Sequence, residues 1–489
     1  MSCEMGIYGM AVMGQNFALN IASKGFSVCV GNRSHAKVEL TVNRAKAEGE
    51  LPITGSESVE DFVSKIQTPR RVVILVQAGK PVDATIAALS EYMEEGDVII
   101  DGGNEWYVNT LRRGKELEEK GIMFIGMGIS GGEEGARNGP SLMLGGPKEA
   151  YDLMEPIVTK CAAMVEGEPC SGNLGPLGAG NYVKMVHNGI EYGDMQLIGE
   201  VYDVLKQVCK MSNPDMAALF EKWNSTELDS YLVEITAKIL AKEDDLTGEG
   251  YVVDYVLDKT GMKGTGRWVV QEAAERNTAA PTVAGALDAR YISGRKEERV
   301  VASKLLMGPT SDQMPNVDAN QVIEDLAAAM YCSKICSYAQ GMGIIKNMSN
   351  DFEWGVDLAK CASVWRGGCI IRAGLLGKIQ KAYENNADLA NLMVDPTFAA
   401  ELNERQAAWR RIVTLCVASG IGCPSLSGSL QYYDAYRRER LPANLVQAQR
   451  DFFGGHTYQR TDREGVFHTS WTEAHKDIGD ISGRTAGEL

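Results

Sequence analysis

The pattern of hydrophobic positions divides the chain into an early part of short apolar runs and a later part of long helical stretches. Up to about residue 177, short apolar runs alternate with stretches of helical periodicity. The predicted strands are Met5–Tyr8, Ser27–Gly31, Val72–Val76, Val98–Asp101 and Met123–Gly126, and the first predicted helix is Gln15–Lys24, closed by Gly25. This alternation predicts an α/β fold with a doubly wound parallel sheet.

Long amphipathic stretches replace the strands from about Gly178 and continue to about residue 435. They include Val183–Cys209, Leu228–Ala241 and Asn320–Tyr338, and they predict a large all-α domain. Beyond Leu441 the chain turns polar and irregular, with glycines, aromatic residues and charges, and such a tail either frays or docks on another surface. The expected parts are 1–177, 178–440 and 441–489.

Composition limits the classes of ligand and the compartment. A formal net charge of −16 over 489 residues disfavours binding to nucleic acid or to an anionic membrane, so an anionic ligand must meet a local basic cluster. No segment approaches the ~18 uninterrupted apolar residues of a membrane span, and the first residues lack the pattern of an export signal. Eleven cysteines contain no CxxC pair, and five histidines show no metal-ligand spacing. We therefore expect a cytoplasmic protein with reduced thiols and no catalytic metal.

A glycine-containing turn follows the first predicted strand and opens the first predicted helix. It reads Gly9-Met10-Ala11-Val12-Met13-Gly14, with Ala11 at the middle glycine position of a GxGxxG loop. Its backbone N–H groups and the helix dipole can face the pyrophosphate of a dinucleotide, as in Rossmann-like domains. The alternative is that glycines at a tight turn serve packing only.

The end of the second predicted strand indicates which dinucleotide binds. An NAD enzyme carries an acidic residue there, which would repel a 2′-phosphate. This sequence has Asn32, Arg33, Ser34 and Lys37 instead, and Arg33 can bond to or stack on that phosphate. The sequence thus favours NADP over NAD. The alternative is that these residues form an ordinary helix N-cap with basic side chains on the surface.

A second glycine-rich segment lies just after the last predicted strand, where ligands of parallel sheets usually bind. Ser130, Gly131 and Gly132 could offer a hydroxyl and backbone amides to a carboxylate, or could form a structural turn. Glu133 and Glu134 are interpreted as solvated or capping residues.

The most specific pattern is a polar face on the first long helix after Gly178. At ~100° of rotation per residue, the polar side chains of this helix fall within an arc of about 140° around its axis. The polar residues are Lys184, His187, Asn188, Glu191 and Tyr192, and the opposite side carries Val183, Val186, Ile190 and Leu197. Such a helix can bury the apolar side and present a base and an acid to a cleft, because burial can lower the pKa of a lysine towards neutrality. The alternative is an exposed face with a Lys–Glu pair, which contributes little to stability.

Several cationic residues follow that could meet a phosphate. Lys263 stands among glycines in GMKGTGRW, and Arg290 and Arg450 add two guanidinium groups. Isolated arginines are more often surface charges.

These segments together resemble one enzyme family along nearly the whole chain. The motifs GMAVMG, NRS, MGISGGEEGARNGPS, KMVHNGIEY, KGTGRW and QRDFFGGHTY occur in the order found in 6-phosphogluconate dehydrogenases. The resemblance implies a Rossmann-like dinucleotide-binding domain, a large all-α domain and an extended C-terminal tail that reaches the partner's active site in a homodimer. It implies metal-independent oxidative decarboxylation of 6-phosphogluconate to ribulose 5-phosphate and CO2 with reduction of NADP, in the pentose phosphate pathway and gluconate utilization.

The resemblance also implies roles for individual residues. Lys184 resembles the general base and Glu191 the general acid. The substrate's carboxylate and hydroxyls are expected to bind at Ser130, Gly131, Gly132, His187 and Asn188. The substrate's phosphate is expected to bind at Tyr192, Lys263, Arg290 and the partner subunit's Arg450. His456 of the tail is expected to contact the sugar acid as well. Asn104 is expected near both nicotinamide and substrate, and Val76, Gln77 and Ala78 at the cofactor. Met262 departs from the small polar residue common before KGTG, which puts the local loop contacts in doubt.

Two other functions remain open on the sequence. A β-hydroxyacid dehydrogenase for shorter substrates shares the glycine loop and the helix lysine, but it needs neither 489 residues nor three cationic phosphate contacts. A non-catalytic NADPH-binding scaffold would keep the fold without the chemistry, and intact Lys184 and Glu191 argue against it.

Overall fold

The computed structural model describes residues 2–262, 264–310, 313, 315–471 and 479–480. The chain forms two compact units, Met1–Leu430 and Gln431–Leu489, which we describe separately. Within the described residues no helix is both long and apolar enough to cross a membrane.

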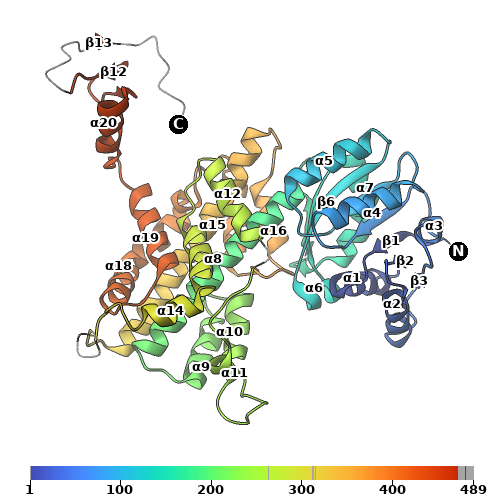
Figure 1. Cartoon of the computed structure of the whole chain (residues 1–489), viewed down its shortest axis with the longest axis horizontal. Coiled ribbons are helices and arrows are strands. Elements are labelled where there is room, and N and C mark those ends of the chain that lie inside the picture. Colours follow the sequence, from blue (N-terminus) through green and yellow to red (C-terminus); the bar gives the residue numbers. More distant parts are fainter. Residues whose placement is uncertain (1, 263, 311–312, 314, 472–478, 481–489) are drawn as a thin grey trace. The chain divides into compact units, whose positions relative to one another are not determined.

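The early part of the first unit is built on an eight-stranded sheet (Figure 1). Its strands are β1 (Met5–Tyr8), β2 (Val28–Gly31), β3 (Ile53–Gly55), β4 (Arg71–Ile74), β5 (Val98–Asp101), β6 (Met123–Ser130), β7 (Ser141–Gly145) and β10 (Ser171–Asn173). They lie in the order β10-β7-β6-β5-β4-β1-β2-β3. All neighbours are parallel except β6 and β7, so the predicted doubly wound arrangement is confirmed with one antiparallel pair added. A separate two-stranded sheet joins β8 (Met164–Val165) to β9 (Glu168–Pro169).

Helices cover both faces of this sheet because its strands are apolar on both sides. They are α1 (Val12–Ser23), α2 (His35–Ala47), α3 (Val59–Ser64), α4 (Lys80–Ser90), α5 (Tyr107–Glu118), α6 (Gly132–Asn138) and α7 (Lys148–Cys161). Alternate strand residues such as Ile7 and Val73 join α1 and α7 in one core cluster. Their neighbours, such as Val72 and Ile74, pack in another cluster with α3, α4 and α5.

Several predicted boundaries were wrong. The last strand runs past Gly126 to Ser130, because Gly126–Ser130 pairs with β7. The first helix begins at Val12 rather than Gln15, since the Ala11 carbonyl already accepts from the Gln15 amide.

The rest of the first unit is helical, as predicted (Figure 1). Its elements are α8 (Ala179–Gln207), α9 (Asn213–Trp223), α10 (Tyr231–Ala241), α11 (Val252–Tyr255), α12 (Thr265–Glu275), α13 (Pro281–Ser293), α14 (Lys296–Ala302), α15 (Ala319–Asp351), α16 (Leu358–Trp365), α17 (Leu375–Asn385), η1 (Leu392–Val394), α18 (Pro396–Ala418) and the first half of α19 (Pro424–Tyr436), whose remaining residues belong to the second unit. The long helix α8 packs against α12, α13 and α15 and also against strands β6 and β7. It therefore connects the sheet to the helical part.

Buried polar contacts fix α8 to its neighbours. Lys334 of α15 pairs with Asp194 of α8 at 2.6 Å, and both side chains are almost fully buried. Glu200 accepts hydrogen bonds from the amides of Ser425 and Leu426, at 2.9 and 2.8 Å, and so caps the first turn of α19.

The second unit adds regular elements to the tail that we expected beyond Leu441. It contains a 12-residue helix, α20 (Ala443–Gly454), followed by β11 (Tyr458–Gln459), β12 (Val466–His468) and β13 (Gly479–Asp480) in a small antiparallel sheet. Apolar side chains of this helix, such as Leu445 and Phe453, are exposed.

The buried Asp451 carboxylate ties this unit together. It accepts hydrogen bonds from the amides of Thr457 and Thr469 and from the Trp471 indole, and it contacts the His468 imidazole at 2.8 Å.

Candidate active site

The turn between β1 and α1 has the shape that a dinucleotide requires. Gly9 has a φ of +112°, and a Cβ there would lie 2.3 Å from the Leu75 carbonyl oxygen. A Cβ on Gly14 would lie 1.9 Å from the Gly9 oxygen, so both positions need glycine. Helix α1 has no side-chain cap and no acid in its first turn, which leaves its first amides available to an anion. These features fit a pyrophosphate.

The segment after β2 lies beside this turn. The Asn32 side-chain oxygen accepts from the Met10 amide at 3.0 Å, which joins the two loops. Arg33, Ser34 and Lys37 are exposed. Ser34 occupies the cap position of α2 but makes no side-chain cap hydrogen bond, which counts against the alternative of a simple helix cap. The exposed cations are therefore free to meet a 2′-phosphate.

Strand β6 carries a stripe of glycines that our sequence interpretation overlooked. A Cβ on Gly126 would lie 1.9 Å from the Asn181 side-chain oxygen, and a Cβ on Gly128 would lie 2.3 Å from Lys184 Cβ. Alternate residues of a strand face one side, so this stripe lets α8 lie directly on the sheet. The signal in the sequence is the spacing Gly126-Met127-Gly128 within an apolar run.

Lys184 lies at this contact, with only 5% of the residue exposed. Its Nζ donates to the Asn188 side-chain oxygen at 2.8 Å and lies 3.3 Å from His187 Nδ1. Burial lowers the pKa of Lys184 and outweighs the attraction of Glu191. Burial thus biases the Lys184 amine towards its neutral form, which is the form that can accept a proton.

His187 is the most enclosed member of the polar face. Burial and the neighbouring Lys184 hold its pKa well below the usual range, so the imidazole is neutral. Its Nε2 lies 3.2 Å from Ser130 Oγ, and its ring meets the edge of Trp365. Its Nδ1 lies 3.3 Å from both Lys184 Nζ and the Asn188 side-chain oxygen, so the donor and acceptor roles at both ring nitrogens depend on the tautomer.

Glu191 differs from Lys184 in the direction of its shift. Burial raises its pKa, although the positive charges of Lys184 and Arg290 oppose the change. Its carboxylate lies 3.9 Å from His187 Nδ1 and keeps 22% of its side chain exposed. One helix face therefore holds a lysine biased towards its neutral form and a glutamate biased towards its protonated form.

Tyr192 and Arg290 meet at the C-terminal end of this face. The guanidinium carbon lies 3.5 Å from the centre of the tyrosine ring, and Nη1 donates to the Gly261 carbonyl at 3.3 Å. This places Arg290 next to the KGTG segment. Lys263 itself lies outside the described residues.

The Ser130-Gly131-Gly132 segment is positioned by a loop distant in sequence. Ser130 ends β6, and Gly132 begins α6. Gly131 has a φ of +117°, and a Cβ there would lie 2.5 Å from the Gly368 carbonyl oxygen. The loop after Trp365 thus supports the site, and the repeated glycine in RGGC was its signal in the sequence.

Asn104, after β5, and the segment Val76–Ala78, after β4, follow neighbouring strand ends. Asn104 lines a small cleft together with Gly103, Glu105, Asn181, Lys184, Met185, Asn188 and Thr265. The alternative of an exposed Lys–Glu face is not what the structure has, because Lys184, His187, Asn188 and Tyr192 of α8 are all buried.

Known proteins match this chain over almost its whole length. The model of the NAD binding domain of 6-phosphogluconate dehydrogenase matches residues 4–172, and that of the C-terminal domain matches residues 180–471. The chain belongs to the 6-phosphogluconate dehydrogenase family. A decarboxylating 6-phosphogluconate dehydrogenase of Spinacia oleracea is 58% identical over 97% of this chain and 98% of the relative. An NADP(+)-dependent, decarboxylating one of Bacillus subtilis is 50% identical over 96% and 99%.

A solved structure agrees with this assignment. The 6-phosphogluconate dehydrogenase of Plasmodium falciparum, studied with NADP+ and with 6-phosphogluconate, has a TM-score of 0.92 and 48% identity, covering 96% of this chain and 100% of that one. The family resemblance and the order of a dinucleotide-binding and a helical part are therefore confirmed.

Two residues expected at the 6-phosphogluconate dehydrogenase site belong to the second unit. Arg450 lies on α20 and donates to the Gln447 side chain at 3.1 Å. His456 follows the helix and meets the edge of the Phe453 ring.

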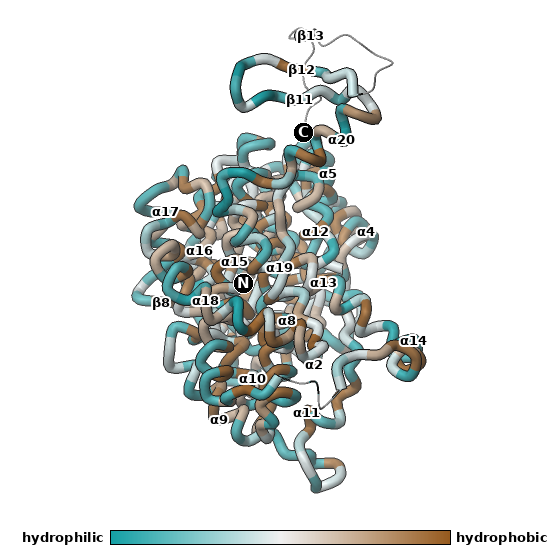
Figure 2. Tube along the Cα trace, turned by 90° about the vertical axis from the view of Figure 1, so that its left-hand side faces the viewer, coloured by the Kyte–Doolittle hydropathy of each residue, from teal (hydrophilic) through white to brown (hydrophobic). Residues whose placement is uncertain are grey.

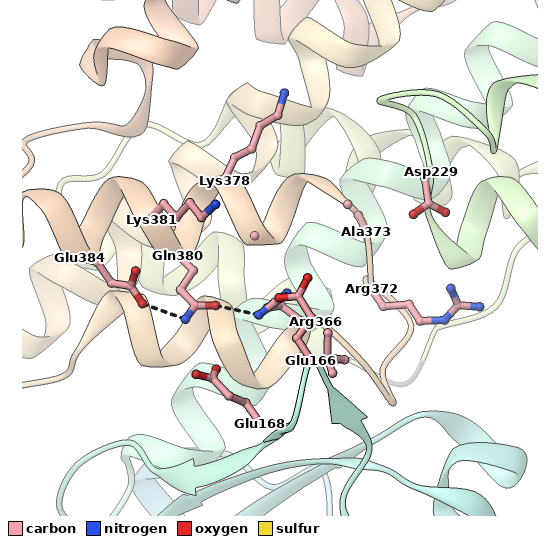
Figure 3. Close-up of a pocket in the computed structure, with 13 residues that line it drawn as sticks. Glu166, Glu168, Asp229, Arg366, Arg372, Ala373, Lys378, Gln380, Lys381 and Glu384 are labelled. Atoms are coloured by element: carbon pink, nitrogen blue, oxygen red, sulfur yellow. Dashed lines mark hydrogen bonds and ion pairs between the residues drawn. The ribbon is translucent and has the colours of Figure 1, made fainter.

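A larger pocket in this chain is lined by other residues than the polar face of α8 (Figure 3). Many of its charged side chains have protein partners: Arg366 bonds to Glu166 and Gln380 within the lining, and Lys378 pairs with Glu401 outside it. Among the described residues, no predicted site residue lines it. Size alone therefore does not identify the candidate active site.

Proposed function

We propose that this chain oxidises and decarboxylates 6-phosphogluconate to ribulose 5-phosphate and CO2 with NADP, with Lys184 as the general base and Glu191 as the general acid. The observation that carries these roles is the single helix face on which burial shifts the two pKa values in opposite directions. Membership of the family supports the substrate and the cofactor.

Binding would orient the substrate along this face. Ser130, the amides of Gly131 and Gly132, His187 and Asn188 supply donors for the carboxylate and hydroxyls. Tyr192 and Arg290 supply donors for the phosphate, joined by Lys263 and by the partner subunit's Arg450. His456 of the tail would contact the sugar acid.

The chemistry needs one proton to leave and another to arrive. Neutral Lys184 removes the proton of the 3-hydroxyl. Asn104 and the Val76–Ala78 segment would hold NADP, which when bound would supply the acceptor for the hydride that leaves C3. The resulting 3-keto acid loses CO2 as the electron pair of the C1–C2 bond moves towards the C3 oxygen, stabilised by protonated Lys184. Glu191 then protonates the former C2, which becomes C1 of ribulose 5-phosphate.

The direct test is an NADPH absorbance assay with 6-phosphogluconate, with a chelator present and CO2 measured. NADPH and CO2 should form in equal amounts and without loss of rate in chelator, because the route uses side chains only. No turnover would favour the non-catalytic scaffold, and turnover of a short β-hydroxy acid in its place would favour the alternative dehydrogenase. Inhibition by the chelator would contradict metal independence.

We infer further that two copies form a homodimer in the cytoplasm, each lending its tail to the other's site. Exposed apolar residues at and after α14 support a covered surface, among them Leu305, Leu306 and Met307 at 74%, 76% and 97% exposure (Figure 2). The free thiols of all eleven cysteines support the compartment. We also propose that the domain boundaries lie at 177/178 and 440/441.

Deleting residues 440–489 tests the exchange of tails. We expect most activity to be lost while the rest of the chain still folds, because Arg450 and His456 are removed. Circular dichroism and sedimentation would report folding and assembly. A truncated, active monomer would contradict the proposal.

A further inference from the structure

Arg113 of α5 lies buried beneath two loops to which the proposed function assigns the cofactor. Only 1% of its side chain is exposed. One loop, between β4 and α4, contains Val76–Ala78 and ends at Gly79. The other, between β5 and α5, contains Asn104 and Glu105.

The Arg113 guanidinium holds both loops at once. Its Nη2 donates to the Gly79 carbonyl at 3.0 Å, and its Nη1 pairs with Glu105 Oε2 at 2.6 Å. The same Glu105 oxygen accepts from the Gly79 amide at 2.8 Å. Gly79 is thereby fixed through both its N–H and its C=O, and Arg113 and Glu105 close a ring of contacts between the loops.

Two further carboxylates complete the surroundings of Arg113. Asp83 Oδ1 lies 2.7 Å from its Nε, and Asp101 Oδ2 lies 3.6 Å from its Nη1. Asp101 also accepts from the Gly103 amide at 3.0 Å, so the end of β5 joins the cluster. Well-packed apolar residues in place of a buried ionic network are often neutral or stabilising. Stability alone therefore does not account for this cluster, whereas control of loop shape does.

The order of the strands shows which part of a dinucleotide would meet these loops. The ends of β2, β1, β4 and β5 lie side by side along one edge of the sheet. A cofactor with its 2′-phosphate at Arg33 and its pyrophosphate at the Gly9 turn continues across β4 and β5. Its path ends at the cleft that Asn104 shares with Lys184. The loops held by Arg113 would thus contact the nicotinamide half.

We propose that Arg113 is a positioning residue that acts through Glu105 and Gly79 to hold the β4–α4 and β5–α5 loops in the shape that accepts the nicotinamide half of NADP. This inference rests on the proposed function. It predicts that loss of the network weakens contacts at one end of the cofactor and leaves the other end unchanged.

The test compares two ligands on the full-length protein by calorimetry. Adenosine 2′,5′-bisphosphate carries the 2′-phosphate end of NADP without the nicotinamide. In Arg113→Met and in Glu105→Gln, we expect the Kd for NADP to rise about tenfold and that for the bisphosphate to stay within about twofold of the parent. The matched control is Lys115→Met, because Lys115 lies on the same helix, is exposed and, among the contacts described, pairs with none of the three carboxylates around Arg113. It should change neither affinity.

Equal losses for both ligands, or no loss of NADP affinity, would overturn the proposal. If Arg113→Met does not fold, as judged by its unfolding temperature, Glu105→Gln alone decides the outcome, since it preserves side-chain size. The KM for NADP should rise in the same variants without a matching rise in the KM for 6-phosphogluconate. Failure of the parent protein to turn over 6-phosphogluconate would refute the proposed function but leave the binding comparison intact.

Discussion

The cofactor turn after β1 and the polar face of α8 present their functional groups in opposite ways. The turn offers backbone amides, shaped by Gly9 and Gly14, beside the exposed side chain of Arg33. The face offers buried side chains, led by Lys184 and His187, that lie against the glycine stripe of β6.

The difference follows from what each region has to do. Recognition of a phosphate needs donors of fixed charge, and amides and guanidinium groups supply them even in contact with water. Proton transfer near neutral pH needs groups whose pKa values are shifted, and burial is the direct way to shift them. In the proposed function, exposed cations would therefore select the cofactor, and buried side chains would carry the reaction.

The largest expected effect comes from removing the buried amine. Lys184→Met should lower kcat by at least about 10³-fold, because it removes the group proposed to take the 3-hydroxyl proton. An NADPH absorbance assay measures the loss, and calorimetry should still detect 6-phosphogluconate binding. Lys206→Met is the matched control, since Lys206 lies on the same helix and pairs with Asp254 away from the face. Turnover within about tenfold of the parent would remove Lys184 as the base.

Disturbing the close contact between α8 and β6 should have the second largest effect on activity. Gly128→Ala introduces a Cβ 2.3 Å from Lys184 Cβ, so α8 must shift. We expect kcat to fall about 100-fold from misplacement of the lysine, with a lower unfolding temperature and unchanged NADP affinity. Gly199→Ala on α8 meets nothing within 4 Å and should be harmless. Full activity of Gly128→Ala would show that the contact is not needed.

The exposed cation should give a smaller and more selective effect. Arg33→Ala should raise the KM for NADP about tenfold and leave the KM for NAD nearly unchanged, because only NADP carries the 2′-phosphate. Lys46→Ala, at an exposed position of α2, serves as the control. Equal losses for both cofactors would contradict the assignment.

The smallest expected effect is a shift along the pH axis. Only neutral Lys184 can accept the proton, so the rate of hydride transfer in a single turnover should rise with pH. Its midpoint should lie below the ordinary lysine value of 10.5, because burial lowers this pKa. Glu191→Gln should move this midpoint to a lower pH than in the parent, because the Glu191 charge raises the pKa of Lys184. A rate independent of pH would contradict the assignment of the base.

Patterns in the sequence predicted those features of the fold that depend on residues close together in the chain. Apolar runs located β1 and β5 correctly, and helical periodicity placed Lys184 and Glu191 on one face. Contacts between distant residues left no such pattern. The pairing of β6 with β7, the seating of α8 on Gly128 and the approach of Gly368 to Gly131 all depend on tertiary packing.

The Asp451 carboxylate has a consequence for how the last segment of the chain meets a partner. Its hydrogen bonds to Thr457, Thr469 and Trp471, together with the contact to His468, join the helix to the strands within one unit. Much of the conformational entropy is thus lost when this unit folds, before any encounter. Association would then resemble the docking of a preformed surface more than the coupled folding of a flexible peptide.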